Sequence, residues 1–504
     1  MKVLKDNNGK IIIFNNKAFT VLGTSPDIEL PKYNGHVDTE GLTALGWDSD
    51  DIAWLQAHVW WNAEDDEYWA VTEANLAFGP NGATPLTWAN RTSVQTNPDV
   101  RYFPKFNLNP SSNTSWASLL SFYIYVCAIP THGWNTSNVT SLNSTFSYNY
   151  SLRSVGDLSS WNVAKVTSLA YTFYLCYPLI DVGNLDSWNT ANITSMVYMF
   201  YACYALTNVG DLSQWNTEKV TSIQGAFHTC RSLRSIGELS NWNISAMTNI
   251  CGAFQNCISL TSIGDLSNWD TSKVTRMDNL MYACARINHI GDLSKWDTSS
   301  VTNMGSMFYN CFSLTSVGDL SKWDTSKVTN MASMFSYCYL LSQTLDLSSW
   351  DTSIVTNMSY MFGGGNTYLT KLNVNDWDLS SVTNISRMFW ACYCLTELDL
   401  TDWDTSTVTD VGTSAGLSMF SECRSLHTLK LGPKFFNFTP AKIYINQCNC
   451  WTRDSIYESL YTNQTLRDSN SSAKTVALST NTYDSLSVQD IEDIATKNIT
   501  LTRG

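Results

Sequence analysis

The sequence predicts a mainly β protein built as a parallel solenoid of about eleven coils of 27 residues, with a further segment on each side of the repeat. Three observations support this fold class. Tryptophan recurs at a fixed interval, the residues around each tryptophan recur with it, and the composition favours burial and turns. A fixed period of this length is typical of solenoids, because one unit cannot bury its apolar face alone and must stack on its neighbours.

The tryptophan period is strict. Successive tryptophans are 27 residues apart from the first to the tenth, and the eleventh follows after 26. We expect these side chains to form a structural ladder with one rung per coil. The ladder consists of Trp134, Trp161, Trp188, Trp215, Trp242, Trp269, Trp296, Trp323, Trp350, Trp377 and Trp403.

Each part of the unit favours a particular local structure, as the coil around Trp323 illustrates. Residues 314–321 predict a short strand whose Leu and Val side chains point inward, and residues 324–326 (Asp-Thr-Ser) predict a turn. Residues 328–331 alternate apolar and polar side chains, which favours a second short strand. Residues 334–338 predict a short helical or 3₁₀ turn that carries the bulky core side chains.

The composition limits the class of protein. Hydrophobic residues make up 44% of the chain and charged residues only 15%, which is typical of a folded protein. The net charge is −14 and there is no basic cluster, so we expect no nucleic-acid partner. No apolar run approaches the roughly 18 to 20 residues that span a bilayer, so we expect no membrane insertion. The apolar run 11–14 is too short for a standard signal peptide.

The unit that begins at Trp323 reads W-D-T-S-K-V-T-N-M-A-S-M-F-S-Y-C-Y-L-L, and this pattern resembles the BspA-like leucine-rich repeat family. The resemblance covers roughly residues 116–436. It implies a parallel leucine-rich-repeat-type solenoid and a family of bacterial surface or secreted proteins, with similar arrays in bacteriophage proteins. Most units here carry V/I-G-D-L-S, one residue longer than the family's L-D-L-S, and we expect the added glycine to place a bulge in that strand.

The expected organisation has three parts: an N-terminal Trp-rich cap or attachment domain over 1–110, the solenoid over 111–436 and a C-terminal capping domain over 437–504. Both flanking parts resemble modules of phage and bacterial repeat proteins.

The N-terminal part is predicted to be a small helical domain. Asp48 or Ser49 is a good helix N-cap, and Ile52, Leu55 and Val59 fall on one helical face.

The C-terminal part is predicted to be an α+β cap. Strand-like segments at 474–480 and 499–502 lie on either side of a helical pattern over 485–497.

The fourteen cysteines raise the question of metal binding or disulfides. Stacked coils bring cysteines of one column near disulfide distance. Leucine-rich repeats, however, use an interior Asn or Cys at one position, where two other units carry Asn149 and Gly365. We therefore predict buried, reduced thiols and assembly in a reducing compartment. The column comprises Cys176, Cys203, Cys230, Cys257, Cys284, Cys311, Cys338, Cys392 and Cys423.

No catalytic, metal or cofactor site is predicted. The spacings of Cys392 with Cys394 and of Cys448 with Cys450 do not match a zinc site, and the six histidines are scattered. Residues 363–366 (Gly-Gly-Gly-Asn) lack the Lys-Ser/Thr of a phosphate loop, which leaves a local loosening of the coil as the interpretation. The acidic run 64–67 lacks EF-hand spacing and is interpreted as a solvated helix face.

Aromatic residues gather beside the cysteine position, thirteen and sixteen residues after the tryptophan. If they face solvent, they form a recognition surface for a protein or a surface glycan; if they face inward, they belong to the core. The sequence leaves both arrangements open. The candidate recognition residues are Tyr174, Tyr177, Tyr201, Tyr204, Tyr282, Tyr309, Phe312, Tyr339, Trp390 and Tyr393.

These features predict a non-enzymatic structural or binding protein that presents a repeat surface for host-surface or protein recognition. The expected setting is a phage virion, as a fibre, tail or decoration protein in contact with other virion proteins. The reasons are that no export signal is visible and that the cysteines are predicted to be free thiols rather than disulfides. The alternatives are a secreted or cell-surface bacterial adhesin, and an enzyme whose N-terminal domain is catalytic and is targeted by the repeats. Oligomerisation is compatible with the sequence.

Overall fold

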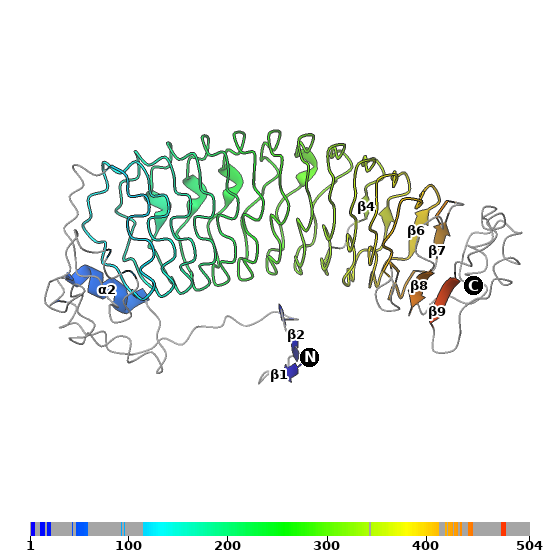
Figure 1. The fold of residues 1–504 in the computed structure, drawn as a ribbon, viewed down its shortest axis with the longest axis horizontal. Helices are drawn as coiled ribbons and strands as arrows, with labels where there is room; N and C mark the ends of the chain where they lie inside the picture. The colour runs from blue at the N-terminus through cyan, green and yellow to red at the C-terminus, as the bar shows by residue number, and fades with distance from the viewer. Residues whose placement is uncertain are drawn as a thin grey trace, which may run out of the picture.

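The structure is a computed structural model that describes most of the repeat region: residues 114–341, 344–412, 419–420, 422–426, 428–431 and 434–435. Outside the repeat it describes residues 2–5, 11–15, 18–21, 43, 47–58, 92, 95, 442–446 and 475–479. The repeat coils stack in chain order into a curved solenoid, with a convex and a concave edge (Figure 1).

Neighbouring coils are joined by backbone hydrogen bonds at equivalent positions. Thr302 N–H donates to the carbonyl oxygen of Thr275 at 2.9 Å, and the same bond recurs along the solenoid. The predicted second strand is reduced to a single bridging residue in each coil. The parallel bridges run through Ser141, Ser168, Ser195, Ser222, Asn249, Arg276, Asn303, Asn330, Asn357, Asn384 and Asp410.

The segment before the tryptophan forms a strand only in coils that lack the extra glycine. There, β4 (Leu345–Asp346) pairs in parallel with β5 (Leu372–Asn373), and β6 (Glu397–Leu400) pairs in parallel with β7 (Thr428–Leu431).

In the other coils the predicted strand, as at 314–321, is not formed, although early coils keep isolated parallel bridges there, as between Ser154 and Asp181. Gly318 has φ +79°, a left-handed conformation that ends the extended backbone. The structure therefore has a break at the glycine in place of the expected bulge. Short 3₁₀ turns follow the glycine in four coils: η3 (Leu185–Ser187), η4 (Leu212–Gln214), η5 (Leu239–Asn241) and η6 (Leu293–Lys295).

The segment from ten to fifteen residues after the tryptophan is a series of turns and not the predicted helical or 3₁₀ turn. Ser306 and Asn310 have φ values of 55° and 59°, so a left-handed residue recurs after four residues in this segment. Every second N–H group of this segment donates to the next coil, as from Ser306 to the carbonyl oxygen of Ala332 at 2.8 Å. Coil stacking thus selects the backbone conformation of this segment.

The core is one continuous column of buried side chains inside the stacked coils. All eleven ladder tryptophans are buried. The rings of Trp296 and Trp323 lie 6.2 Å apart and nearly parallel, and those of Phe146 and Phe173 lie 5.2 Å apart. Met281 takes the phenylalanine position in one coil and is also buried.

Upstream of the solenoid, α2 (Ser49–His58) forms where the capping pattern predicts it. The Asp48 carboxylate caps the helix by accepting a hydrogen bond from the Asp51 N–H at 2.9 Å. Asp51 is itself buried and accepts a hydrogen bond from the His132 N–H at 3.2 Å. The helix therefore contacts the first coils.

The sequence suggested a small helical domain at the N-terminus, but the structure also has β-strands there. β1 (Lys2–Lys5), β2 (Ile11–Asn15) and β3 (Ala18–Val21) form a three-stranded antiparallel sheet.

Beyond the solenoid, β8 (Lys442–Asn446) pairs in parallel with β9 (Thr475–Ser479), which lies where a strand was expected. The expected helix over 485–497, the expected strand at 499–502, the acidic run 64–67 and the pair Cys448 and Cys450 all lie outside the described residues. Within the described part of the chain, none of the helices has the length and hydrophobicity required to span a membrane.

Candidate functional site: an aromatic face

The aromatic residues beside the cysteine column form two surface columns that run along the solenoid. The ring centroids of Tyr174 and Tyr201 lie 4.9 Å apart, and those of Tyr177 and Tyr204 lie 5.1 Å apart, with the rings stacked. Most of these side chains are half-buried, and Tyr204 is 40% exposed. The ring faces therefore cover one another, while ring edges and hydroxyl groups remain at the surface.

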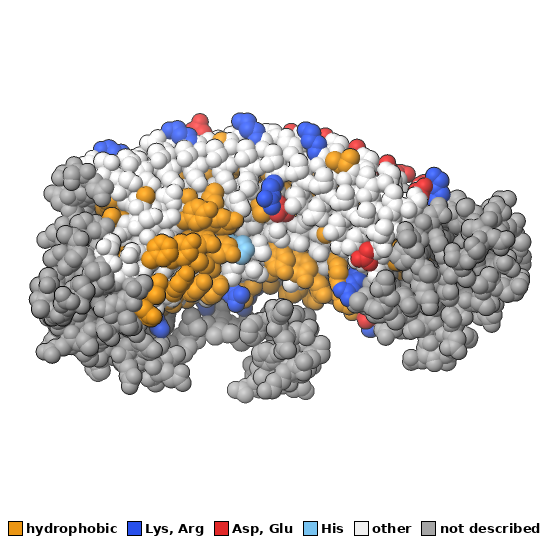
Figure 2. Space-filling view, viewed as in Figure 1, with side chains coloured by type: hydrophobic (Ala, Val, Ile, Leu, Met, Phe, Trp, Pro, Cys, Tyr) orange, Lys and Arg blue, Asp and Glu red, His pale blue; other side chains and the backbone are white. Residues whose placement is uncertain are grey.

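We call the aromatic side chains on the surface of the early coils, from Phe122 to His228, the first aromatic patch. Its rings form an unbroken chain of stacked and edge contacts, from the Phe122–Tyr148 pair at 4.5 Å to the Tyr201–His228 pair at 4.5 Å. Figure 2 shows hydrophobic side chains gathered in two areas of one side of the molecule. The first patch comprises Phe122, Tyr148, Tyr150, Tyr171, Tyr174, Tyr177, Tyr198, Tyr201, Tyr204 and His228.

A second aromatic patch lies on later coils. Tyr282 stacks on Tyr309 at 4.6 Å, and Phe312 stacks on Tyr339 at 4.9 Å. The Tyr393 hydroxyl donates to the Glu422 carboxylate at 3.4 Å. The second patch comprises Tyr282, Tyr309, Phe312, Tyr337, Tyr339, Trp390 and Tyr393, and the two patches together form what we call the aromatic face.

The glycines at 363–365 make room for this second patch. A Cβ at Gly364 would lie 2.7 Å from the Tyr337 ring, and one at Gly365 would lie 3.2 Å from Tyr339 and 3.4 Å from Tyr393. The glycine run is therefore a site of close packing between aromatic rings. The interpretation of this run as a local loosening of the coil is therefore wrong.

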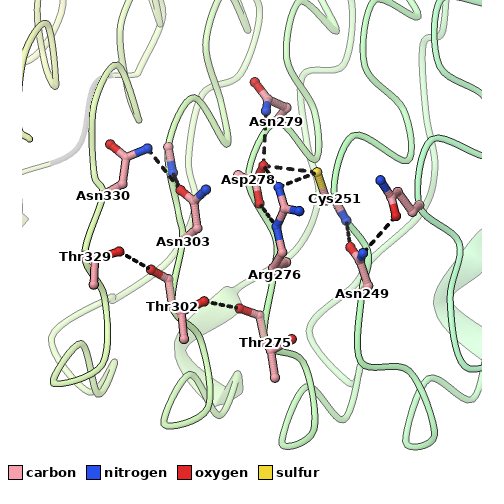
Figure 3. A network of polar contacts seen from close by, with 12 residues as sticks. Asn249, Cys251, Thr275, Arg276, Asp278, Asn279, Thr302, Asn303, Thr329 and Asn330 are labelled. Atoms are coloured by element: carbon pink, nitrogen blue, oxygen red, sulfur yellow. Dashed lines mark hydrogen bonds and ion pairs between the residues drawn. The ribbon is translucent and has the colours of Figure 1, made fainter.

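A polar cluster around Asp278 belongs to the coils between those of the two patches, and Figure 3 shows it from close by. The Asp278 carboxylate is buried and accepts two hydrogen bonds from the Arg276 guanidinium, at 2.9 and 2.7 Å. The Cys251 thiol donates to the same carboxylate at 3.1 Å. Burial, reinforced by this carboxylate, raises the pKa of Cys251 to about 12, so the thiol stays protonated at neutral pH. The cluster is a neutralised ion pair with an unreactive thiol.

The cysteine column lies beneath the aromatic face. The Cys311 thiol donates to the carbonyl oxygen of Met281 at 3.1 Å, and Cys257 makes the same bond to Phe227 at 3.0 Å. Burial raises the pKa of both thiols to about 12. All nine cysteines of the column are buried and free, as the sequence predicted.

Two asparagines replace cysteine in this column. The Asn149 amide donates to the carbonyl oxygen of Leu120 at 2.8 Å, as predicted for an interior asparagine. The placement of Gly365 at this position is wrong. The Asn366 amide occupies it and donates to the carbonyl oxygen of Phe335 at 3.0 Å, because that coil has one extra residue before the column.

Charged residues are sorted between the two sides of the coil. In the described coils, six of the seven arginines lie between seven and nineteen residues after the tryptophan, in the segment that carries the aromatic face. The seventh, Arg424, is 21 residues after Trp403 and lies over the Tyr393 ring of the same face. Acidic residues concentrate around the tryptophan instead, as Asp292 and Asp297 do around Trp296. Figure 2 shows basic and acidic side chains mixed along the convex edge. The arginines are Arg153, Arg231, Arg234, Arg276, Arg286, Arg387 and Arg424.

The sequence reasoning did not single out these arginines, although sorting residues by their position in the period would have found them. In the described part of the chain, no group of three or more His, Cys, Asp or Glu side chains has an arrangement that could hold a metal ion.

The stacked coils and the surface columns define a solenoid repeat protein. Residues 125–238, 232–318 and 313–429 match the family described as "Mycoplasma protein of unknown function, DUF285". Together the matches span residues 125–429, which is more than half of the 504-residue chain. The chain therefore belongs to this family.

Among solved structures, the chain is similar to a leucine-rich repeat protein from Bacteroides ovatus, with 17% identity, 62% of this chain and 87% of that chain covered, and a TM-score of 0.20. It is also similar to the plant peptide hormone receptor RGFR1 in complex with RGF2, with 12% identity, 67% and 52% coverage, and a TM-score of 0.23. The chain thus covers about half of that receptor chain. No curated protein matches the chain significantly.

Proposed function

We propose that this protein is a non-enzymatic binding protein and that the aromatic face docks a protein partner. The observation that carries the proposal is the stacking of half-buried tyrosines in surface columns. Tyrosine offers a large, rigid contact area with a polar tip, which is why it is enriched in protein-binding surfaces. Because these rings already pack against neighbouring rings, docking a partner costs little further side-chain entropy.

The core accounts for folding without the aromatic face. The tryptophan, phenylalanine and cysteine columns are buried, whereas Tyr174, Tyr201 and their equivalents lie outside them. An extended apolar surface that folding does not require is typical of an interaction site.

The stacking also favours a protein partner over a surface glycan. Sugar rings pack on exposed faces of aromatic rings, and in these columns the faces are taken by neighbours, as in the Tyr150–Tyr177–Tyr204 stack. Ring edges and hydroxyl groups suit the mixed polar and apolar surface of a protein.

For the setting, we propose a phage virion component that contacts the host surface, with a bacterial adhesin as the alternative. The column of buried free thiols supports folding in a reducing compartment, which a virion protein made inside the cell experiences. Mass spectrometry of purified phage particles tests this. Recovery of the chain in particles would support the proposal, and labelling of intact cells with none in particles would contradict it.

The binding role is tested by adding the labelled full chain to candidate host cells. We expect saturable binding that unlabelled wild-type chain displaces. A Tyr177→Ser/Tyr204→Ser variant should fail to displace it, because it lacks two adjacent rings of the first patch. Displacement by the variant as effective as by wild type would contradict the role of the aromatic face.

A further inference from the structure

Resting on this binding role, we propose that the partner segment that docks on the aromatic face is an acidic stretch of polypeptide. Its carboxylates would meet the exposed guanidinium groups of Arg231 and Arg286, and its apolar side chains would meet the edges of the tyrosine columns.

The first support is the sorting of charge. The chain has a net charge of −14, yet the segment from seven to nineteen residues after each tryptophan carries arginine, no lysine and few acids in the described coils. Two of those acids already have basic partners: Asp278 is paired with Arg276, and Glu422 with Arg424. The aromatic face is therefore positive within an acidic protein, and it attracts anionic partners.

The second support is the geometry of the arginines. Arg231 lies over the Tyr204 ring at 5.0 Å, Arg387 over Tyr360 at 4.8 Å and Arg424 over Tyr393 at 5.0 Å. Stacking on a ring fixes the plane of the guanidinium. Arg424 already donates to the Glu422 carboxylate at 3.3 Å, so Arg231 and Arg387 carry this part of the argument. A guanidinium held in this way is prepared for a bidentate carboxylate, at a smaller entropic cost than a free side chain.

The third support is the orientation of the rings. Aromatic edges carry partial positive charge, and the stacked columns expose edges along their length. Carboxylate and carbonyl oxygens are therefore favoured at this surface. Nucleobases and sugars bind mainly through ring faces, which the columns do not offer, so an acidic polypeptide fits better than an anionic glycan or a nucleic acid.

Fluorescence anisotropy with the full chain tests the proposal. The probe is a fluorescein-labelled peptide of repeating Glu-Leu-Gly-Glu, compared with Gln and Lys versions of the same length. We expect the Glu peptide to bind at least about tenfold more tightly than the Gln peptide at low salt, and to weaken as NaCl is raised to about 0.5 M.

Charge-reversed variants locate the binding. Arg231→Glu/Arg286→Glu should weaken Glu-peptide binding by about tenfold or more. The matched control is Lys273→Glu/Lys327→Glu, which changes the net charge equally at exposed positions outside the aromatic face. The control should bind within about twofold of wild type, because its charges lie away from the docking surface.

The outcomes separate this inference from the binding role. Equal affinity for the Glu and Gln peptides, with both lost in Tyr177→Ser/Tyr204→Ser, would overturn the acidic partner and leave the binding role standing. Peptide binding that is unchanged in both the arginine variant and the tyrosine variant would overturn both the acidic partner and the binding role. Stronger competition by alginate or by an oligonucleotide than by the Glu peptide would also overturn the acidic polypeptide.

Discussion

The indole N–H of Trp323 donates a hydrogen bond to the carbonyl oxygen of Leu293, 2.9 Å away on the preceding coil. Each described ladder tryptophan from Trp188 to Trp403 makes the equivalent bond. Trp161 is equally buried, but its indole nitrogen has no partner among the described residues. The ladder therefore joins coils by hydrogen bonds as well as by stacking, except near its start.

This difference gives a matched pair of substitutions. Trp323→Phe removes ring volume and one of the two hydrogen bonds that the Leu293 carbonyl accepts, since the Trp296 N–H still donates to it at 3.1 Å. Trp161→Phe removes ring volume and an indole N–H that has no partner among the described residues. We expect Trp323→Phe to lower the free energy of unfolding by about 0.5–1.5 kcal/mol more than Trp161→Phe does, the net value of one hydrogen bond. Urea unfolding followed by tryptophan fluorescence measures both. Equal losses would show that the indole hydrogen bond contributes little.

The glycine that precedes the tryptophan in most coils gives a second prediction, with Gly133, directly before Trp134, as the comparison. Gly318 and Gly133 both have left-handed φ values, +79° and +74°. A Cβ at Gly318 would lie 2.9 Å from the Asp292 Cα, whereas a Cβ at Gly133 would meet nothing within 4 Å. Both alanine variants should lose about 1–3 kcal/mol from backbone strain, and Gly318→Ala should lose more because of the clash. Melting temperatures compare them, and a larger drop for Gly133→Ala would contradict this account.

The cysteine column predicts alkaline destabilisation. Burial raises the pKa of Cys257 and Cys311 from an ordinary value near 9 to about 12. Between pH 9 and 12 the thiols of the unfolded chain ionise, while those of the folded chain stay protonated. Ionisation therefore stabilises the unfolded state relative to the folded state. The stability these thiols contribute is complete below pH 9 and falls as the pH rises toward 12.

The measurement is urea unfolding of wild type and Cys257→Ala/Cys311→Ala at pH 7 and pH 10. The variant should be less stable at pH 7, because it lacks two thiol hydrogen bonds and leaves two small cavities. Its deficit should shrink at pH 10, since it has two fewer thiols to ionise. A deficit that stays constant or grows with pH would contradict the assignment of raised pKa values to these thiols.

The 27-residue period predicted the solenoid. It also predicted the tryptophan ladder and the cysteine column, because each of them repeats one residue type at a fixed position of the period. Backbone conformation was harder to predict. Non-glycine residues such as Ser306 and Tyr337 adopt positive φ values because coil-to-coil hydrogen bonds require them, and no residue type marks those positions. The insertion before Asn366 shifted the column by one residue, and a fixed count from Trp350 placed Gly365 there instead.

The aromatic face could not be assigned from sequence for a related reason. A column of tyrosines at a fixed position is compatible with the core or with the surface, since stacking between coils stabilises either arrangement. The structure gives an intermediate answer: the rings stack outside the core and are half-buried. Tyr177 lies between Tyr150 and Tyr204, so its removal also costs some packing.

The central claim is that the aromatic face serves binding and not folding. The most direct test measures host-surface affinity and melting temperature together for Tyr204→Ser and for Ile354→Ser, which are 40% and 43% exposed in wild type. We expect Tyr204→Ser to weaken binding by about tenfold, as for a central aromatic contact, with a melting temperature close to that of Ile354→Ser, which should bind like wild type. Unchanged binding by Tyr204→Ser, or a binding loss that follows a large fall in melting temperature, would contradict the account.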